Sequence, residues 1–157
     1  MNPKEIISKL ELLPHPEGGY YREMYRSDET IDTPQGKRNV CTAIYYLLEN
    51  KDKSNFHRIK SDECWFFHQG NALEIFVLDN ATLKTITLGN DIMNGELPQA
   101  IIPANCWFAS KVKNESGFAL VSCTVAPGFD FRDFEMADRQ KLLQEFPKQR
   151  ELITIFT

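Results

Sequence analysis

The 157-residue sequence lacks a long apolar run, an excess of basic residues and a secretion signal. No stretch approaches the ~18 apolar residues of a transmembrane helix, which argues against a membrane-spanning chain. Acidic residues outnumber basic ones by 22 to 18, and the resulting charge of −4 argues against nucleic acid or an anionic membrane as partner. The first residues contain neither a basic region nor a signal cleavage site, so we expect a cytoplasmic protein.

Motifs for several common chemistries are also missing. The four cysteines form no CxxC pair, which argues against a zinc knuckle, and in a reducing compartment we expect them to be small apolar side chains. There is no GxGxxG or GxxxxGK[ST] sequence, so a dinucleotide or P-loop site is not indicated. A GxSxG nucleophile elbow is absent as well.

Short segments with strand-like composition, separated by turn residues, dominate the chain. They cover residues 20–26, 39–48, 54–60, 63–69, 72–79, 82–88, 99–102, 106–112 and 117–126. Because no crossover helices separate them, the pattern predicts an all-β sandwich or barrel and argues against a parallel α/β sheet. The length favours a single domain over 1–157, with the barrel at about 20–126.

Helices are expected only near the two ends of the chain. An Asn-Pro start followed by a glutamate predicts a capped helix over residues 3–13. A second helix is expected over about 135–146, where it ends at a proline. Residues 28–38 are polar and are expected to form a flexible loop. In the C-terminal tail 147–157, the segment ELITIFT is β-prone and could add an edge strand.

Three passages carry a resemblance to a known family. Residues 57–70 read HRIKSDECWFFHQG, in which His57, Glu63 and Gly70 resemble the first motif of the cupin superfamily. HPEGGYYRE at 15–23 and CTVAPGFDFRDFE at 123–135 extend the resemblance to an RmlC-like, single-domain branch of cupin-5 type. The resemblance covers about residues 3–147. It implies a cupin double-stranded β-helix, which is a jelly-roll barrel, and a homodimer.

The chain departs from the cupin pattern at the metal ligands. In the family, two histidines and a glutamate of the first motif and a histidine of the second hold a metal. Here Ile59 and Phe108 stand where two of these histidines would be, so only His57 and Glu63 remain. Catalytic zinc and iron sites normally need three protein ligands, so we expect no metal cofactor. If a divalent metal binds, His68 is the candidate third ligand, although a bulge would be needed to turn it inward.

A metal-free site is the leading hypothesis for function. His57 would act as the base and Glu63 would orient its ring, because an imidazole both takes and gives protons near neutral pH. Other residues expected at the pocket or its mouth are Tyr21, Arg22, Trp65 and Phe108. These features favour a small-molecule-binding cupin that isomerises or epimerises a carbohydrate-like or other polar metabolite.

Two other functions stay open at this point. A non-catalytic module that senses or stores a ligand would bind without turnover. A metal-dependent oxygenase or hydrolase would need His68, or water, to complete a degenerate metal site.

Overall fold

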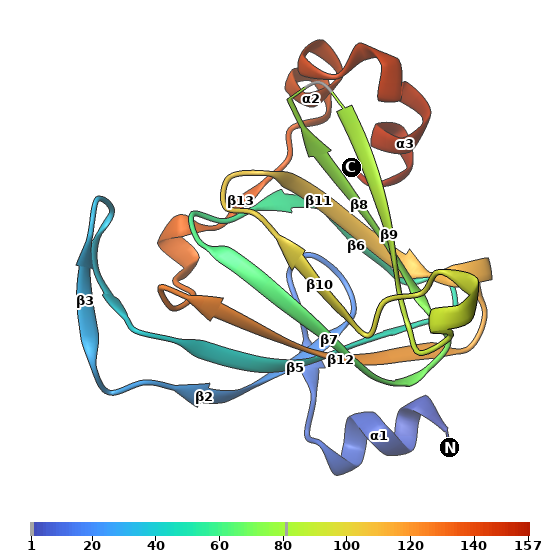
Figure 1. Ribbon diagram of the computed structural model, residues 1–157, viewed down its shortest axis with the longest axis horizontal. Coiled ribbons are helices and arrows are strands. Elements are labelled where there is room, and N and C mark those ends of the chain that lie inside the picture. The colour runs from blue at the N-terminus through green and yellow to red at the C-terminus, as the bar shows by residue number, and fades with distance from the viewer. Residues whose placement is uncertain (1, 81) are drawn as a thin grey trace.

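The computed structural model describes residues 2–80 and 82–157, and it shows two facing antiparallel sheets (Figure 1). Across these residues, one sheet has six strands in the order β1-β2-β5-β12-β7-β10, and the other has five in the order β13-β6-β11-β8-β9. A small hairpin of β3 and β4 projects beyond the six-stranded sheet (Figure 1). The all-β jelly-roll prediction is confirmed.

The strands of the six-stranded sheet are β1 (Leu13–Pro14), β2 (Tyr20–Arg26), β5 (Thr42–Glu49), β12 (Phe118–Ala126), β7 (Asp62–Gly70) and β10 (Gln99–Ile102). Those of the five-stranded sheet are β13 (Glu135–Met136), β6 (Lys53–Arg58), β11 (Trp107–Val112), β8 (Leu73–Asp79) and β9 (Thr82–Leu88). The hairpin consists of β3 (Thr30–Thr33) and β4 (Gly36–Asn39). The α-helices are α1 (Pro3–Lys9), α2 (Arg139–Glu145) and α3 (Arg150–Ile155), and the 3-10 turns are η1 (Ile92–Asn94), η2 (Lys113–Glu115), η3 (Phe131–Asp133) and η4 (Pro147–Gln149).

All nine predicted strands are present, with ends that differ by at most three residues. The N-terminal half of the chain differs from the sequence prediction at two other places. Helix α1 has the predicted capping box but ends at Lys9, and the chain then turns through Glu11, whose φ is 52°. Residues 28–38 were expected as a loop but form most of the β3–β4 hairpin, closed by a turn at Pro34–Gln35.

The C-terminal part requires two further corrections. The second helix begins at Arg139 rather than at 135, because Asp138 caps it and the preceding Glu135–Met136 pairs with strand β6. The tail, expected as an edge strand, is helix α3 instead. Its apolar residues at helical spacing bury Ile153 and Phe156 against the five-stranded sheet, so tertiary packing overrides the β-prone composition.

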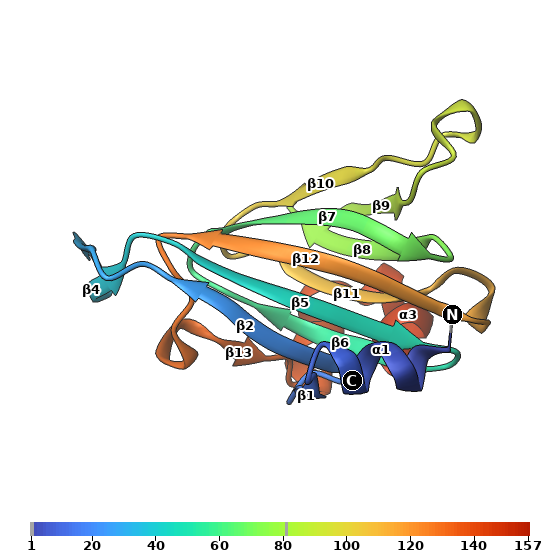
Figure 2. The same cartoon turned by 90° about the horizontal axis from the view of Figure 1, so that it is seen from below.

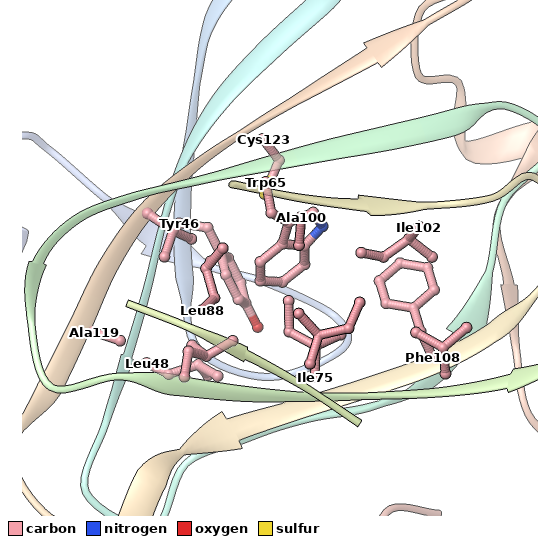
Figure 3. Packing of buried hydrophobic residues seen from close by; sticks show 14 of the residues in the cluster. Tyr46, Leu48, Trp65, Ile75, Leu88, Ala100, Ile102, Phe108, Ala119 and Cys123 are labelled. Atoms are coloured by element: carbon pink, nitrogen blue, oxygen red, sulfur yellow. The ribbon is translucent and has the colours of Figure 1, made fainter. Parts of the chain in front are cut away.

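Three apolar clusters stabilise this arrangement. The interior core lies between the two sheets and includes Trp65, Phe108 and Ile75 (Figure 3). Helices α2 and α3 cover the outer face of the five-stranded sheet, whereas α1 covers part of the outer face of the six-stranded sheet (Figure 2). Within the described residues, no helix has both the length and the apolar character needed to cross a membrane.

Candidate functional site

A cavity of about 660 Å³ opens at one end of the barrel. Strands β2, β5, β6, β7 and β12 form its walls, together with the segment that follows β12. The lining residues are Leu13, His15, Glu17, Tyr21, Arg22, Glu23, Arg26, Thr42, Ile44, His57, Ile59, Glu63, Cys123, Val125, Phe129, Asp130, Phe131 and Phe134. A concave site of this size, with apolar walls and a few converging polar groups, is typical of small-molecule binding.

The loop before β2 places Glu17 on the floor of this cavity. Gly18 and Gly19 have φ values of 115° and 73°, in the left-handed region that favours glycine. A Cβ at Gly18 would lie 1.9 Å from the carbonyl oxygen of Lys53, so a larger residue would push the loop off strand β6. Asn55 N–H donates to the Glu17 carbonyl at 2.9 Å and fixes the loop further.

His57 and Glu17 form a buried pair on this floor. His57 Nε2 lies 2.8 Å from Glu17 Oε2, and the two side chains are 3% and 8% exposed. On the other side of the ring, Nδ1 is 2.7 Å from the carbonyl oxygen of Asn55. Because a carbonyl can only accept, Nδ1 carries a proton. The ring also packs against Phe108 and Phe134, with centroid distances of 4.1 and 5.4 Å.

The electrostatics of the pair favour an imidazolium beside a carboxylate. Burial alone lowers the pKa of His57, but the Glu17 charge and hydrogen bond outweigh it and raise the pKa above its ordinary value. For Glu17, burial raises the pKa, but the charge and hydrogen bond of His57 reverse this effect and lower it. Each partner therefore keeps the other charged within a largely apolar site.

Glu63 lies on the same floor in a different electrostatic state. It extends from β7, it is buried, and no cation forms a salt bridge with it among the described residues. Burial raises the pKa of Glu63, the nearby Glu17 carboxylate raises it further, and His57 opposes both. The result is a pKa of about 7. Glu63 therefore exchanges its proton near neutral pH.

The segment after β12 forms an aromatic wall at the mouth of the cavity. Its three rings, Phe129, Phe131 and Phe134, pack edge to face with centroid distances of 4.9 to 6.1 Å. Phe131 is 53% exposed although it is large and apolar, so the wall presents an aromatic surface to whatever enters.

Two arginines attach this wall to the rest of the barrel. Arg26 donates to both Glu23 carboxylate oxygens and to the Phe129 carbonyl. Arg38, which belongs to the β3–β4 hairpin, makes a bidentate pair with Asp133 at 2.7 and 2.8 Å. Planar, two-pronged contacts of this kind fix position as well as charge.

The structure brings together four of the six residues predicted for the metal-free site or its mouth. His57, Glu63, Tyr21 and Arg22 line the cavity, and the Arg22 guanidinium is held at 2.7 Å by Glu11. Trp65 and Phe108 were expected at the pocket, but both lie in the interior core and are 1% exposed (Figure 3). They share the inward face with the site but lie deeper in the barrel.

The sequence predicts that the Glu63 carboxylate orients His57. This prediction is wrong, because a different carboxylate does so. The group hydrogen-bonded to His57 is Glu17, which belongs to the loop before β2 and lies outside the motif at residues 57–70. The signal that could have found it is the GG pair next to it, because glycines in a polar loop often mark a close backbone approach. The aromatic wall was also missed.

The donor set does not fit the metal that cupins commonly hold. Ile59 occupies a position where that metal would need a histidine, and it lines the cavity as an apolar side chain. Both nitrogens of His57 already have partners. His68 projects from the exposed face and bonds Ser122 Oγ at 2.8 Å, so it cannot join His57 and Glu63. Over the described residues, no three His, Cys, Asp or Glu side chains are grouped as metal ligands.

Fold and site together define a cupin in which Ile59 and Phe108 stand in place of two of the usual metal-binding histidines. The family model Cupin_5, described as "Cupin superfamily (DUF985)", matches residues 4–137, and the chain belongs to this family. The predicted family is thereby confirmed.

Related proteins share the sequence and, where solved structures are compared, the fold. The chain is similar to the "Uncharacterized protein YML079W" of Saccharomyces cerevisiae, with 32% identity over 146 residues, 83% of this chain and 72% of that one. Protein SO0799 from Shewanella oneidensis is 39% identical with a TM-score of 0.92, covering 100% of this chain and 98% of its own. A hypothetical protein from Leishmania major is 34% identical with a TM-score of 0.94, covering 100% and 99%.

Proposed function

We propose that this cupin binds a carbohydrate-like or other polar metabolite and isomerises it by proton transfer that needs no metal. The observation that carries the proposal is Glu63, a buried carboxyl on the cavity floor next to a charged pair. Its pKa of about 7 lets it take and return a proton at cellular pH.

The roles of the polar residues follow from their protonation. His57 is less suited to act as the base than the sequence suggested, since both of its nitrogens are engaged and its pKa is raised. Glu63, in its ionised form, would take the proton from a substrate carbon and return it to the same or the adjacent carbon. The charged Glu17–His57 pair would hold substrate hydroxyl groups and keep the pKa of Glu63 near neutrality.

A single tuned carboxyl favours isomerisation over epimerisation. Moving a proton between neighbouring carbons on one face needs one acid–base group, whereas inverting a centre needs a second group on the opposite face. Glu63 has a pKa of about 7, whereas the other carboxyl on the floor, Glu17, has a lowered pKa because of His57. Of the two reactions, isomerisation is therefore the one that we propose.

Exchange of carbon-bound hydrogen with solvent tests this chemistry whichever product forms. The protein is incubated in D2O with a panel of aldoses, ketoses and 2-oxo acids, and deuterium incorporation is followed by mass spectrometry and NMR. We expect incorporation into at least one compound and a loss of about 100-fold or more in Glu63→Gln. The control is Glu145→Gln, an exposed carboxyl on α2 outside the cavity.

Absence of exchange with every compound would overturn the proposed catalysis. A second function, a non-catalytic ligand-binding module, is favoured by one observation: the His57 ring is held on both sides in a fixed charged pair. Ligand-observed NMR on the same samples separates the two functions. Binding without exchange would support the module.

A further inference from the structure

We propose that His15 is a second catalytic group of this cavity, a neutral imidazole whose Nε2–H donates to the oxygen of an enolisable carbonyl substrate. The inference rests on the proposed function and narrows its substrate class. It is carried by the hydrogen bonding of His15, by its place in the cavity wall and by its contrast with His57.

The hydrogen bond at Nδ1 fixes which nitrogen of His15 carries the proton. The backbone N–H of Glu17 donates to His15 Nδ1 at 3.2 Å. A backbone amide can only donate, so Nδ1 is unprotonated and the neutral ring has its hydrogen on Nε2. The loop that carries this amide is held against β6, because Asn55 N–H donates to the Glu17 carbonyl.

The remaining nitrogen, Nε2, is the one that a ligand can reach. His15 lines the cavity, and its ring stands edge-on to Tyr21 with a centroid distance of 4.5 Å. Glu17 Oε2 lies 3.7 Å from Nδ1, beyond hydrogen-bond distance, and Nε2 has no hydrogen-bond partner among the described residues. Among the described residues, four side-chain polar atoms are fully buried without a hydrogen-bond partner, in Ser54, Trp65, Trp107 and Ser110. His15 Nε2 is not one of them, so it is accessible. Nε2 is therefore open to the cavity.

The electrostatic surroundings keep this ring neutral. Burial lowers the pKa of His15, the Glu17 carboxylate opposes this effect, and the charged His57 lowers the pKa again. The pKa of His57 shifts in the opposite direction. The two histidines thus divide their tasks: His57 is a fixed cation paired with Glu17, and His15 is a neutral donor.

A neutral donor beside a carboxylate base indicates carbonyl chemistry. When ionised Glu63 takes a proton from the carbon next to a carbonyl, the C–H electron pair forms a C=C bond and negative charge moves onto the carbonyl oxygen. A hydrogen bond from His15 Nε2–H would stabilise that oxygen. Return of the proton to the same carbon regenerates the substrate and exchanges its hydrogen with solvent. Where the adjacent carbon carries a hydroxyl group, delivery of the proton to the former carbonyl carbon gives the isomer, because the hydroxyl proton passes to the original carbonyl oxygen and a new C=O bond forms at the neighbouring carbon. The substrate class is therefore an aldehyde, ketone or 2-oxo acid that carries hydrogen on the adjacent carbon.

Nitrogen NMR of the ¹⁵N-labelled full-length protein tests the tautomer directly and needs no substrate. We expect His15 at pH 7 to show an unprotonated Nδ1 and a protonated Nε2, and His57 to show two protonated nitrogens. A charged His15 at pH 7, or a proton on its Nδ1, would overturn the assignment.

Variants in the D2O exchange experiment test the role in catalysis. For a compound exchanged by the natural protein, His15→Leu should slow exchange about 100-fold, as loss of an oxyanion donor does elsewhere. His15→Gln keeps an N–H donor and should recover at least about a tenth of the rate. His68→Leu, on the exposed face, is the matched control and should not change the rate.

The two proposals fail in different ways. If the natural protein exchanges a compound and His15→Leu does so equally well, the role of His15 is wrong and the proposed function stands. If the natural protein exchanges none, the proposed function and the carbonyl substrate class fall together, while the NMR result still decides whether His15 presents Nε2–H to the cavity.

Discussion

The two ends of the barrel interior are built from the same strands, yet one end is packed and the other is hollow. On β7, Glu63 lines the cavity and Trp65, two residues further, lies in the interior core (Figure 3). On β5, Ile44 lines the cavity and Tyr46 is buried in the core. Alternation along a strand decides which face a side chain takes. Depth along the barrel then decides whether that side chain meets a ligand or other core residues.

Truncating one apolar side chain at each end should separate packing from lining. Ile75→Ala should reduce the free energy of unfolding by about 4 kcal/mol, because it leaves a void in the packed end. Ile59→Ala should cost no more than about 2 kcal/mol, since Ile59 already borders open space. Urea unfolding followed by circular dichroism measures both. Equal losses would mean that the two ends are packed alike.

Removing the carboxylate at the hollow end should also be costly. Glu17→Leu leaves His57 buried without its partner, and we expect a loss of about 3 kcal/mol in unfolding free energy at pH 7. The double variant Glu17→Leu/His57→Leu should recover part of this loss, because no unpaired polar ring remains. A double variant no more stable than the single one would show that the pair holds the fold together by more than its charges.

Glu63 should destabilise the fold as pH rises. Its pKa is about 7 in the folded protein, above the ordinary 4.5, so the folded state binds the proton more tightly than the unfolded state. Stability due to this group is therefore present below pH 4.5 and is lost as pH rises to 7 and above. Glu63→Gln removes the titrating group. Its free energy of unfolding at pH 8 should exceed that of the natural protein by on the order of 3 kcal/mol.

Unfolding measured in parallel at pH 4 and pH 8 checks this prediction. The two proteins should differ little at pH 4, where Glu63 is protonated in the folded state and largely protonated in the unfolded state. An advantage of the same size at both pH values would mean that packing, and not ionisation, distinguishes Gln from Glu at this position.

The smallest effect is expected outside the barrel. His68→Ala removes one hydrogen bond on an exposed face and should change the unfolding free energy by less than about 1 kcal/mol. Native mass spectrometry of protein purified without chelator should give the same metal content for the natural and variant chains. Loss of a bound metal in His68→Ala would contradict the placement of this side chain.

Local patterns predicted most of the fold. Strand boundaries follow from alternation and turn residues, which act within a few positions, and all nine predicted strands are present. The prediction of an edge strand in the tail 147–157 was wrong, because the conformation of the tail depends on an apolar surface supplied by the distant five-stranded sheet. The same limit applies to the site: His57 and Glu63 lie in one motif, whereas Glu17 lies about 40 residues earlier in the chain. The adjacent Gly18–Gly19 pair signals a close backbone approach, but it does not say which strand the loop approaches.

The separate attachment of the aromatic wall bears on how the protein can change. The floor carboxyls and histidines are set by β6, β7 and the glycine loop, but the wall is held through Arg26 and through Arg38 on the β3–β4 hairpin. Substitutions at Phe129, at Phe131 or in the hairpin can thus alter which molecules fit without moving the proton-transfer groups, whereas Phe134 packs against His57 and is tied to them. Evolution or protein engineering can therefore change ligand specificity through the wall and the hairpin while the acid–base residues on the cavity floor stay the same.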